Sequence, residues 1–151
     1  MRNCKFLALF LAGLFCLGGC QSRSGADAEQ KIRAETQKFQ SEMQKIIKDS
    51  GRASQACAVV DRLSSLYIEA YYRNFAFRKE LQTLVSDMNS TMAEFEALRK
   101  KNQEERKIDR GNILDATIEL ANLTTDQEWK KLKKARQSVF NVYARSLEGR
   151  L

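Results

Sequence analysis

Residues 60–84 read VDRLSSLYIEAYYRNFAFRKELQTL, and apolar side chains recur along this stretch at alternating steps of three and four residues. Continued to residue 98, the steps give twelve positions, of which ten are apolar or aromatic: Val60, Leu63, Tyr67, Ala70, Asn74, Phe77, Leu81, Leu84, Met88, Thr91, Phe95 and Leu98. On an α-helix this spacing gathers the side chains into one stripe that packs against partner helices. The stretch therefore predicts a long, heptad-like helix within a helical bundle.

The stripe contains one place where the helix is expected to end. Residues 87–91, DMNST, are poor in helix formers, and Thr91 and Glu94 have the spacing of a capping box at a helix start. These features predict a helix from about residue 53 to 88 and a turn or kink near 89–91. One unbroken helix is the alternative.

The rest of the composition also indicates an all-α chain. The sequence has no proline, and residues 26–148 contain only two glycines, Gly51 and Gly111. Alternating Val, Ile and Thr runs, which would predict strands, are missing. The fold class that follows is an antiparallel bundle of three or four amphipathic helices joined by short turns.

Two further helical stripes flank the long one. The first is made by Ile32, Phe39, Met43, Ile46 and Ile47, and Asp49-Ser50-Gly51 is expected to stop that helix, with Gly51 in the left-handed conformation. The last helix carries Trp129, Leu132, Val139, Phe140, Tyr143 and Leu147.

Between the long stripe and the last helix, the sequence is dense in charge. Residues 99–110, RKKNQEERKIDR, are more typical of a solvated helix than of a loop. The clearest boundary is 122–128, where Thr124 with Gln127, or Thr125 with Glu128, can form a capping box.

The N-terminus has the three zones of an export signal. Arg2 and Lys5 precede the 14 residues 6–19, which have no charged or strongly polar side chain. At about 1.5 Å of rise per residue, this run covers only about 21 Å of the roughly 30 Å of membrane hydrocarbon. The length suits the apolar core of a secretory signal peptide. A leader with an incidental cysteine, or a buried first helix, is the alternative.

Leu17-Gly18-Gly19-Cys20 resembles the lipobox of bacterial lipoproteins. The resemblance implies that residues 1–19 are a signal peptide, that the Cys20 thiol receives diacylglycerol, and that the new amino terminus is acylated, for example with palmitate. Residues 20–26 would then be a lipidated tether and 27–151 the helical bundle domain. Gln21 stands where an aspartate would favour inner-membrane retention. The expected location is therefore the periplasmic side of the outer membrane, or the outer face of the plasma membrane in a host without one.

Charge and cysteine content agree with an exported chain. Residues 20–151 carry 24 basic and 19 acidic side chains, and the pI of about 9.4 would suggest nucleic acid in a cytoplasmic protein. Export excludes nucleic acid and leaves as partners anionic lipid, a cell-wall polymer or an acidic envelope protein, besides the membrane itself. With Cys20 lipidated, Cys57 is the only free thiol, so no intrachain disulfide is expected. Its apolar neighbours favour burial over an intermolecular bond.

Catalytic chemistry is not indicated. The sequence has no histidine, which removes the usual general base, imidazole metal ligands and haem ligation. Neighbouring carboxylates do not fall at a spacing that would converge on a metal ion, and no Gly-rich phosphate loop is present. We therefore expect no catalytic residue, no metal site and no cofactor.

Two segments are candidate binding surfaces. Five aromatic rings fall in residues 67–77, and they are either a bundle core with rim tyrosines or a partner-binding groove: Tyr67, Tyr71, Tyr72, Phe75 and Phe77. Five basic residues follow Trp129, and they are either a solvated face or an anion-binding face: Lys130, Lys131, Lys133, Lys134 and Arg136.

A second resemblance involves Leu123-Thr124-Thr125-Asp126-Gln127, which is similar to the LTxxQ element of periplasmic helical chaperones of the Spy and CpxP family. The resemblance implies a cradle-shaped helical dimer that binds unfolded proteins. Members of that family usually carry two copies of the element and no lipobox, whereas this chain has one copy and a lipobox.

Together these features predict a membrane-anchored periplasmic lipoprotein. Its helical domain would be a non-enzymatic binding or adaptor module for an envelope protein or polymer. The alternative is a tethered chaperone or a pilotin-like escort, and an enzyme is the third interpretation.

Overall fold

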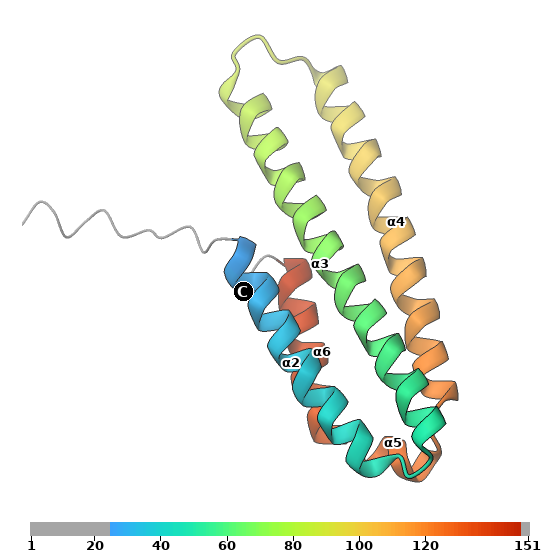
Figure 1. The fold of residues 1–151 in the computed structure, drawn as a ribbon. Coiled ribbons are helices and arrows are strands. Elements are labelled where there is room, and N and C mark those ends of the chain that lie inside the picture. The colour runs from blue at the N-terminus through green and yellow to red at the C-terminus, as the bar shows by residue number, and fades with distance from the viewer. Residues whose placement is uncertain (1–24, 149–151) are drawn as a thin grey trace, which may run out of the picture.

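The computed structural model describes residues 25–148, which form helices joined by short turns and contain no strand (Figure 1). The helices are α2 (Gly25–Ile46), α3 (Ser50–Ser86), α4 (Met92–Asn122), α5 (Asp126–Lys131) and α6 (Lys133–Glu148). The prediction of an all-α fold is confirmed. The predicted signal peptide 1–19, Cys20 and most of the predicted tether lie outside the described residues.

The break predicted near residues 89–91 is also present. α3 ends at Ser86, and α4 begins at Met92 with Thr91 as its N-cap. The Thr91 hydroxyl accepts a hydrogen bond from the Glu94 backbone N–H, while the Glu94 carboxylate accepts one from the Thr91 backbone N–H. This reciprocal cap satisfies backbone donors that a new helix start leaves unpaired. The alternative of one unbroken helix is wrong.

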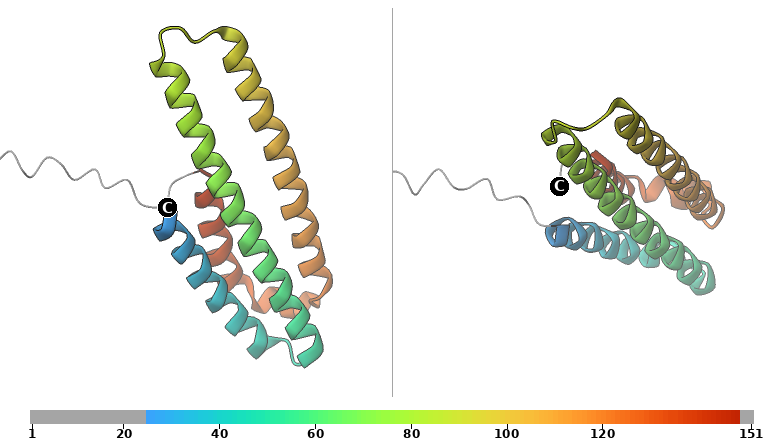
Figure 2. Two further views of the ribbon diagram at one scale, coloured as in Figure 1. Left: turned by 45° about the horizontal axis from the view of Figure 1, so that its top comes forward. Right: turned by 90° about the horizontal axis from the view of Figure 1, so that it is seen from above.

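The body of the molecule is a three-helix bundle with α4 against one side of it. α2 and α6 both pack on the first half of α3 and on each other, and α4 runs alongside α3 (Figure 2). Consecutive long helices are antiparallel, as predicted. The shared core contains apolar residues from each of the predicted stripes: Ile32, Phe39, Met43, Ile47, Ala53, Ala56, Val59, Val60, Leu63, Tyr67, Ile68, Ala116, Leu120, Leu132, Val139 and Tyr143.

A buried polar contact joins all three helices of the body. The Tyr143 ring of α6 stacks on the Tyr67 ring of α3 with 4.3 Å between centroids. The Thr36 hydroxyl of α2 donates to the Ile32 carbonyl, so the Tyr143 hydroxyl donates to Thr36 Oγ1 across 2.7 Å. Because a buried hydroxyl without a partner is costly, this bond lets a tyrosine occupy the core. Burial raises the pKa of Tyr143 to about 12.

Beyond the body, α3 and α4 continue as a two-helix arm, residues 79–101 (Figure 1). At about 1.5 Å per residue, α3 is about 55 Å long, α2 about 33 Å and α6 about 24 Å. Hydrogen bonds from Asn74 to the Leu147 carbonyl and from Arg78 to the Glu148 carbonyl mark where α6 ends beside α3. The arm thus has only its own two helices to bury apolar surface.

The predicted stripe changes its environment where the arm begins. Val60, Leu63, Tyr67 and Ala70 are buried, but the later stripe positions in α3 are only half-buried, and Met88 in the α3–α4 turn is fully exposed. The spacing therefore predicted the helix and not the number of partners. The charged stretch 99–110 is helical, as expected, although Asp109 within it is buried.

Two local predictions were wrong or only partly met. The segment 49–51 does not stop the first helix, which ends at Ile46; it starts α3 instead. Asp49 is the N-cap and its carboxylate accepts the Arg52 backbone N–H at 2.8 Å, a role that suits a short acidic side chain, so Gly51 lies in a helical turn. Cys57 is a free thiol and half-buried rather than part of the core, and burial raises its pKa.

Candidate binding surfaces

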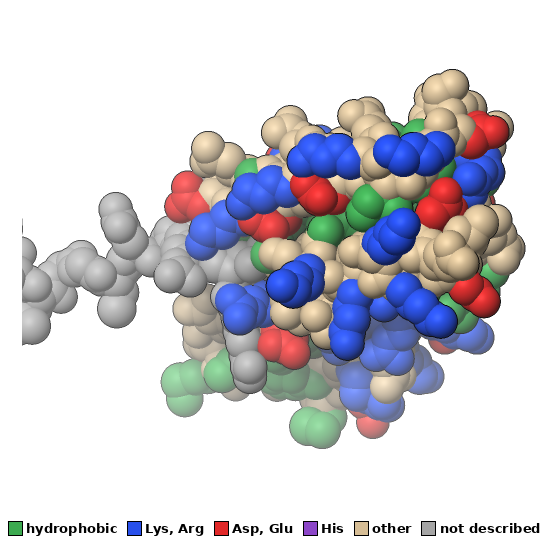
Figure 3. All heavy atoms as spheres, turned by 90° about the horizontal axis from the view of Figure 1, so that it is seen from below, with side chains coloured by type: hydrophobic (Ala, Val, Ile, Leu, Met, Phe, Trp, Pro, Cys, Tyr) green, Lys and Arg blue, Asp and Glu red, His purple; other side chains and the backbone are tan. Residues whose placement is uncertain are grey.

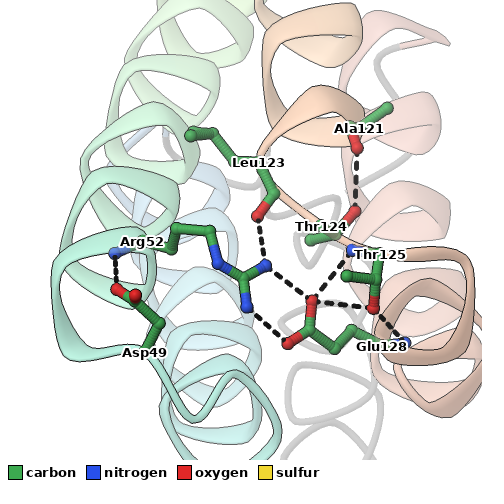
Figure 4. A network of polar contacts seen from close by, with 7 residues as sticks. All are labelled: Asp49, Arg52, Ala121, Leu123, Thr124, Thr125 and Glu128. Atoms are coloured by element: carbon green, nitrogen blue, oxygen red, sulfur yellow. Dashed lines mark hydrogen bonds and ion pairs between the residues drawn. The ribbon is translucent and has the colours of Figure 1, made fainter.

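The turn between α4 and α5 forms a corner that a network of hydrogen bonds holds (Figure 4). Thr125 caps α5: its hydroxyl accepts the Glu128 backbone N–H at 3.3 Å, and the Glu128 carboxylate accepts the Thr125 backbone N–H at 2.8 Å. Of the two capping boxes that the sequence allows here, this one forms. Thr124 instead donates its hydroxyl proton to the Ala121 carbonyl at the end of α4.

Arg52 joins this corner to the start of α3. Its guanidinium donates to both carboxylate oxygens of Glu128, at 2.8 and 3.0 Å, and to the Leu123 carbonyl at 3.3 Å. Such two-pronged pairing fixes orientation as well as contributing energy. The Arg52 guanidinium, followed by the Thr125 backbone N–H, lowers the pKa of Glu128 to about 2. The bond to Glu128 raises the pKa of Arg52.

Four lysines of the predicted basic face extend from this corner. We call Lys130, Lys131, Lys133 and Lys134 the basic end; all four are exposed, and no ion pair joins them to another described residue. Figure 3 looks at this end of the molecule and shows Lys and Arg side chains spread over it, with acidic side chains among them. Arg136 is placed differently, because its guanidinium lies 4.0 Å from the centroid of the Trp129 ring.

The charge of the chain is concentrated at this end. Residues 45–52 and 124–136 hold eight basic and three acidic side chains. That excess equals the whole excess of residues 20–151, so the other residues of this range have as many acidic as basic side chains. This end of the bundle therefore carries five more basic than acidic side chains.

The structure separates the five aromatic residues of 67–77. Tyr67 and Tyr71 are buried, Phe77 is half-buried between α3 and α4, and Tyr72 and Phe75 are exposed. The Tyr72 hydroxyl donates to the Glu29 carboxylate at 3.1 Å. The exposed rings occur where α2 begins and α6 ends, so the body no longer covers this part of α3. A partner could reach only Tyr72 and Phe75 fully.

A polar groove of about 300 Å³ lies where the end of α6 meets α3 and α4. At its floor Arg73 forms a two-pronged ion pair with the buried carboxylate of Asp109, with the Nε hydrogen bond at 3.1 Å. This bond raises the pKa of Arg73. Sequence reasoning missed the pair, since its members are 36 residues apart. The one available signal was that Asp109 falls at helical spacing with Leu98, Asn102 and Ala116.

The described residues offer neither a metal site nor a membrane span. No three His, Cys, Asp or Glu side chains of residues 25–148 converge to hold a metal ion. None of the helices in that range is long and apolar enough to cross a membrane. Cys20, the predicted lipid-attachment site, lies outside this range.

No protein-family model matches the chain, and the searches of characterised proteins and of solved structures found no similar protein.

The corner predicts a pH-dependent contribution to stability. The pKa of Glu128 is lower in the folded than in the unfolded chain, so its contribution is fully present above the ordinary carboxyl pKa near 4.5 and is lost as pH falls towards 2. We expect Glu128→Gln to lower the free energy of unfolding at pH 6 and to approach the wild type near pH 2. Gln can also accept the hydrogen bond from the Thr125 backbone N–H in a capping box, so the substitution removes the negative charge and keeps the cap. Urea unfolding across this pH range measures it.

Glu96→Gln is the matched control, because Glu96 is an exposed carboxylate of α4 without a hydrogen bond or ion pair to another described residue. We expect its unfolding free energy to follow that of the wild type at every pH. A Glu128→Gln deficit of equal size at pH 6 and pH 2 would contradict the assigned role of the charge.

Proposed function

We propose that this chain is a periplasmic lipoprotein, anchored through Cys20, whose helical domain is a non-enzymatic binding module for an anionic envelope polymer or an acidic envelope protein. The observation that carries the proposal is the basic end: four neighbouring lysines, exposed and without ion pairs to described residues, on a corner fixed by Arg52 and Glu128. Rigid presentation of unpaired charge suits recognition of an anionic surface.

The position of the basic end supports a partner away from the anchor. The tether joins the start of α2, and α2 runs about 33 Å from there to the corner (Figure 1). Charge interactions in water fade over about 8 Å at physiological salt. The lysines would thus bind a partner on the side of the molecule that faces away from the anchor. Two or three acyl chains at Cys20 would hold the bundle at the membrane, since one chain binds only reversibly.

The proposal includes no catalysis. The sequence lacks histidine, and the two carboxylates most enclosed by contacts, Asp109 and Glu128, are held by Arg73 and Arg52. A carboxylate held in a two-pronged ion pair is a poor general base, because its lone pairs already accept hydrogen bonds from the guanidinium. For Glu128 the pKa is lowered as well.

The second candidate function is a tethered chaperone or pilotin-like escort. It draws on the Spy- and CpxP-like element at 123–127 and on three apolar side chains that α4 leaves exposed, Ile108, Leu114 and Ile118. In this chain the element has local roles: the Leu123 carbonyl accepts from Arg52, and Thr125 caps α5. These contacts explain residues 123–127 without a bound protein. We therefore prefer the adaptor function to the chaperone function.

The anchor predicts incorporation of lipid at one cysteine. We expect the wild-type chain, expressed in a Gram-negative host with labelled palmitate, to carry the label and to fractionate with membranes. Cys20→Ala should abolish the label. Cys16→Ala, which leaves the four lipobox residues intact, is the control and should keep it. Label retained in Cys20→Ala would disprove the anchor.

The basic end predicts charge-dependent binding. We expect replacement of all four lysines by Gln to weaken retention on isolated cell-wall sacculi or on an acidic envelope protein captured by crosslinking. At about 0.5 kcal/mol per exposed charge contact, the loss is roughly thirtyfold and shrinks as salt is raised. The readout is the bound fraction against concentration at two salt levels.

A control of equal charge is available elsewhere on the chain. Lys31, Lys79, Lys100 and Lys107 are exposed and without ion pairs to described residues, and their replacement by Gln should leave binding nearly unchanged. Equal losses in both variants would show that net charge alone acts and would contradict a site. Suppression of protein aggregation that does not depend on the basic end would favour the chaperone.

A further inference from the structure

The arm ends in an apolar tip. We call residues 85–92 the arm tip; within it Val85 is 70% exposed, Met88 101% and Met92 75%. Single exposed apolar side chains are common on proteins, but here three of them fall within eight residues at the most remote point of the fold. Asp87 is the only charged residue among them.

Apolar surface continues from the arm tip into the arm. A largely apolar groove of about 470 Å³ lies between α3 and α4. Leu84, Ala97 and Leu98 line it together with Thr83, and Glu80, Glu94 and Lys101 also line it. The two helices of the arm do not fill the space between them, because no third helix covers it. Tip and groove together form an apolar surface that the rest of the described chain leaves uncovered.

α2 begins part-way along α3, and the arm tip lies farther along in the same direction, away from the α2–α3 turn (Figure 1). α2 and α3 meet at the short turn 47–49 and run antiparallel, so their lengths can be compared from that turn. α3 has 37 residues and α2 has 22, so α3 continues fifteen residues past the start of α2. At about 1.5 Å per residue, the arm tip therefore lies about 22 Å past the start of α2.

The reach of the tether is about 5 Å shorter than this distance. Gly25 is the fifth residue after Cys20, and an extended chain of that length spans at most about 17 Å. With the Cys20 lipid in the membrane, the start of α2 is never more than about 17 Å from its surface. When the bundle stands upright, the arm tip therefore reaches about 5 Å past the membrane surface, into the headgroup region.

We propose that the arm tip is a second membrane contact, which inserts Val85, Met88 and Met92 into the interface of the membrane that holds the Cys20 lipid. The proposal rests on the proposed anchor. Apolar side chains of peripheral segments enter the headgroup and acyl boundary by about 5–10 Å. The lipid and the arm tip would give two points of attachment and hold the bundle upright, with the basic end facing away from the membrane.

The charges next to the arm tip, in residues 81–98 of the arm, indicate which lipid suits this contact. Residues 81–98 contain three acidic side chains, Asp87, Glu94 and Glu96, and no basic one. Attraction to anionic headgroups therefore does not contribute, and the contact is apolar. Zwitterionic phospholipid is the surface that fits, and added anionic lipid should not strengthen the contact.

A fluorescent label at the arm tip tests the proposal in the full-length lipidated protein. Met88→Cys in a Cys57→Ser background carries the environment-sensitive dye NBD, and Lys48→Cys in the same background is the matched control at the opposite end. Both positions are fully or largely exposed, so neither change removes a core contact. The proteins are reconstituted into zwitterionic vesicles that contain phosphatidylcholine brominated on its acyl chains.

We expect both proteins to float with the vesicles. The dye at residue 88 should shift its emission to shorter wavelength, lose most of its intensity to the brominated lipid, and resist aqueous iodide. The dye at residue 48 should keep its emission wavelength, should keep its intensity with the brominated lipid, and should be quenched by aqueous iodide. Replacing part of the zwitterionic lipid by anionic lipid should leave the quenching at 88 unchanged or weaker.

Other outcomes overturn the proposal in distinguishable ways. Flotation with a dye at 88 that iodide quenches and brominated lipid does not would leave the anchor standing and refute the arm-tip contact. Protection from both quenchers would show that a protein, a second copy included, covers the arm tip. Quenching that requires anionic lipid would refute an apolar contact. Failure to float would refute the anchor, and the arm-tip contact with it.

Discussion

The length of α3 is the constraint on which the other features depend. At about 55 Å it exceeds α2 by about 22 Å and α6 by about 31 Å, so only its first half has two helical partners besides α4. A core with Tyr67 and Tyr143 at its centre forms where the partners exist. Where they end, Tyr72 and Phe75 are exposed, and the arm, its apolar groove and its tip follow.

The second constraint is the direction of the chain at the other end. α4 must return to α6 through a turn, and Arg52 fixes that turn by binding Glu128 and the Leu123 carbonyl. Both members of the pair retain some exposure, so water screens the pair and its contribution to stability is modest. Its effect is geometric: the lysines of α5 and α6 project from a defined corner. The molecule thus has an apolar end and a basic end, separated by the length of α3.

The sequence predicted most of the helices but not their partners, and the last helix that it predicted is divided at Leu132 into α5 and α6. The three-four spacing predicted the helices, and the Thr91 and Glu94 spacing predicted the break, because both signals are local. Asp49 misled because the same residues are compatible with a helix stop and with a helix start. Arg52 with Glu128, and Arg73 with Asp109, pair across 76 and 36 residues, and no local pattern reports such a distance.

The sequence identified the residues of two candidate surfaces but not how those residues are placed in the fold. The basic residues were recognised from composition alone, but the stacking of Arg136 on Trp129, which sets it apart from the four lysines, needed the fold. The aromatic residues of 67–77 share a sequence segment and not an environment, because α2 and α6 cover only part of it. The sequence pattern places Met88 in the apolar stripe and so does not reveal the arm tip. Met88 is exposed because no third helix packs beside the arm.

The claim that two distinct ends are held apart by one straight helix is tested most directly by a distance across it. Spin labels at Lys48→Cys and Met88→Cys, in a Cys57→Ser background, flank the two ends of α3. Pulsed electron–electron double resonance should give one narrow distribution of distances between the labels, centred at about 55–60 Å, the length of the helix and its flanking residues. A broad distribution, or one centred well below that distance, would show a bent helix or a folded-back arm and would contradict the account.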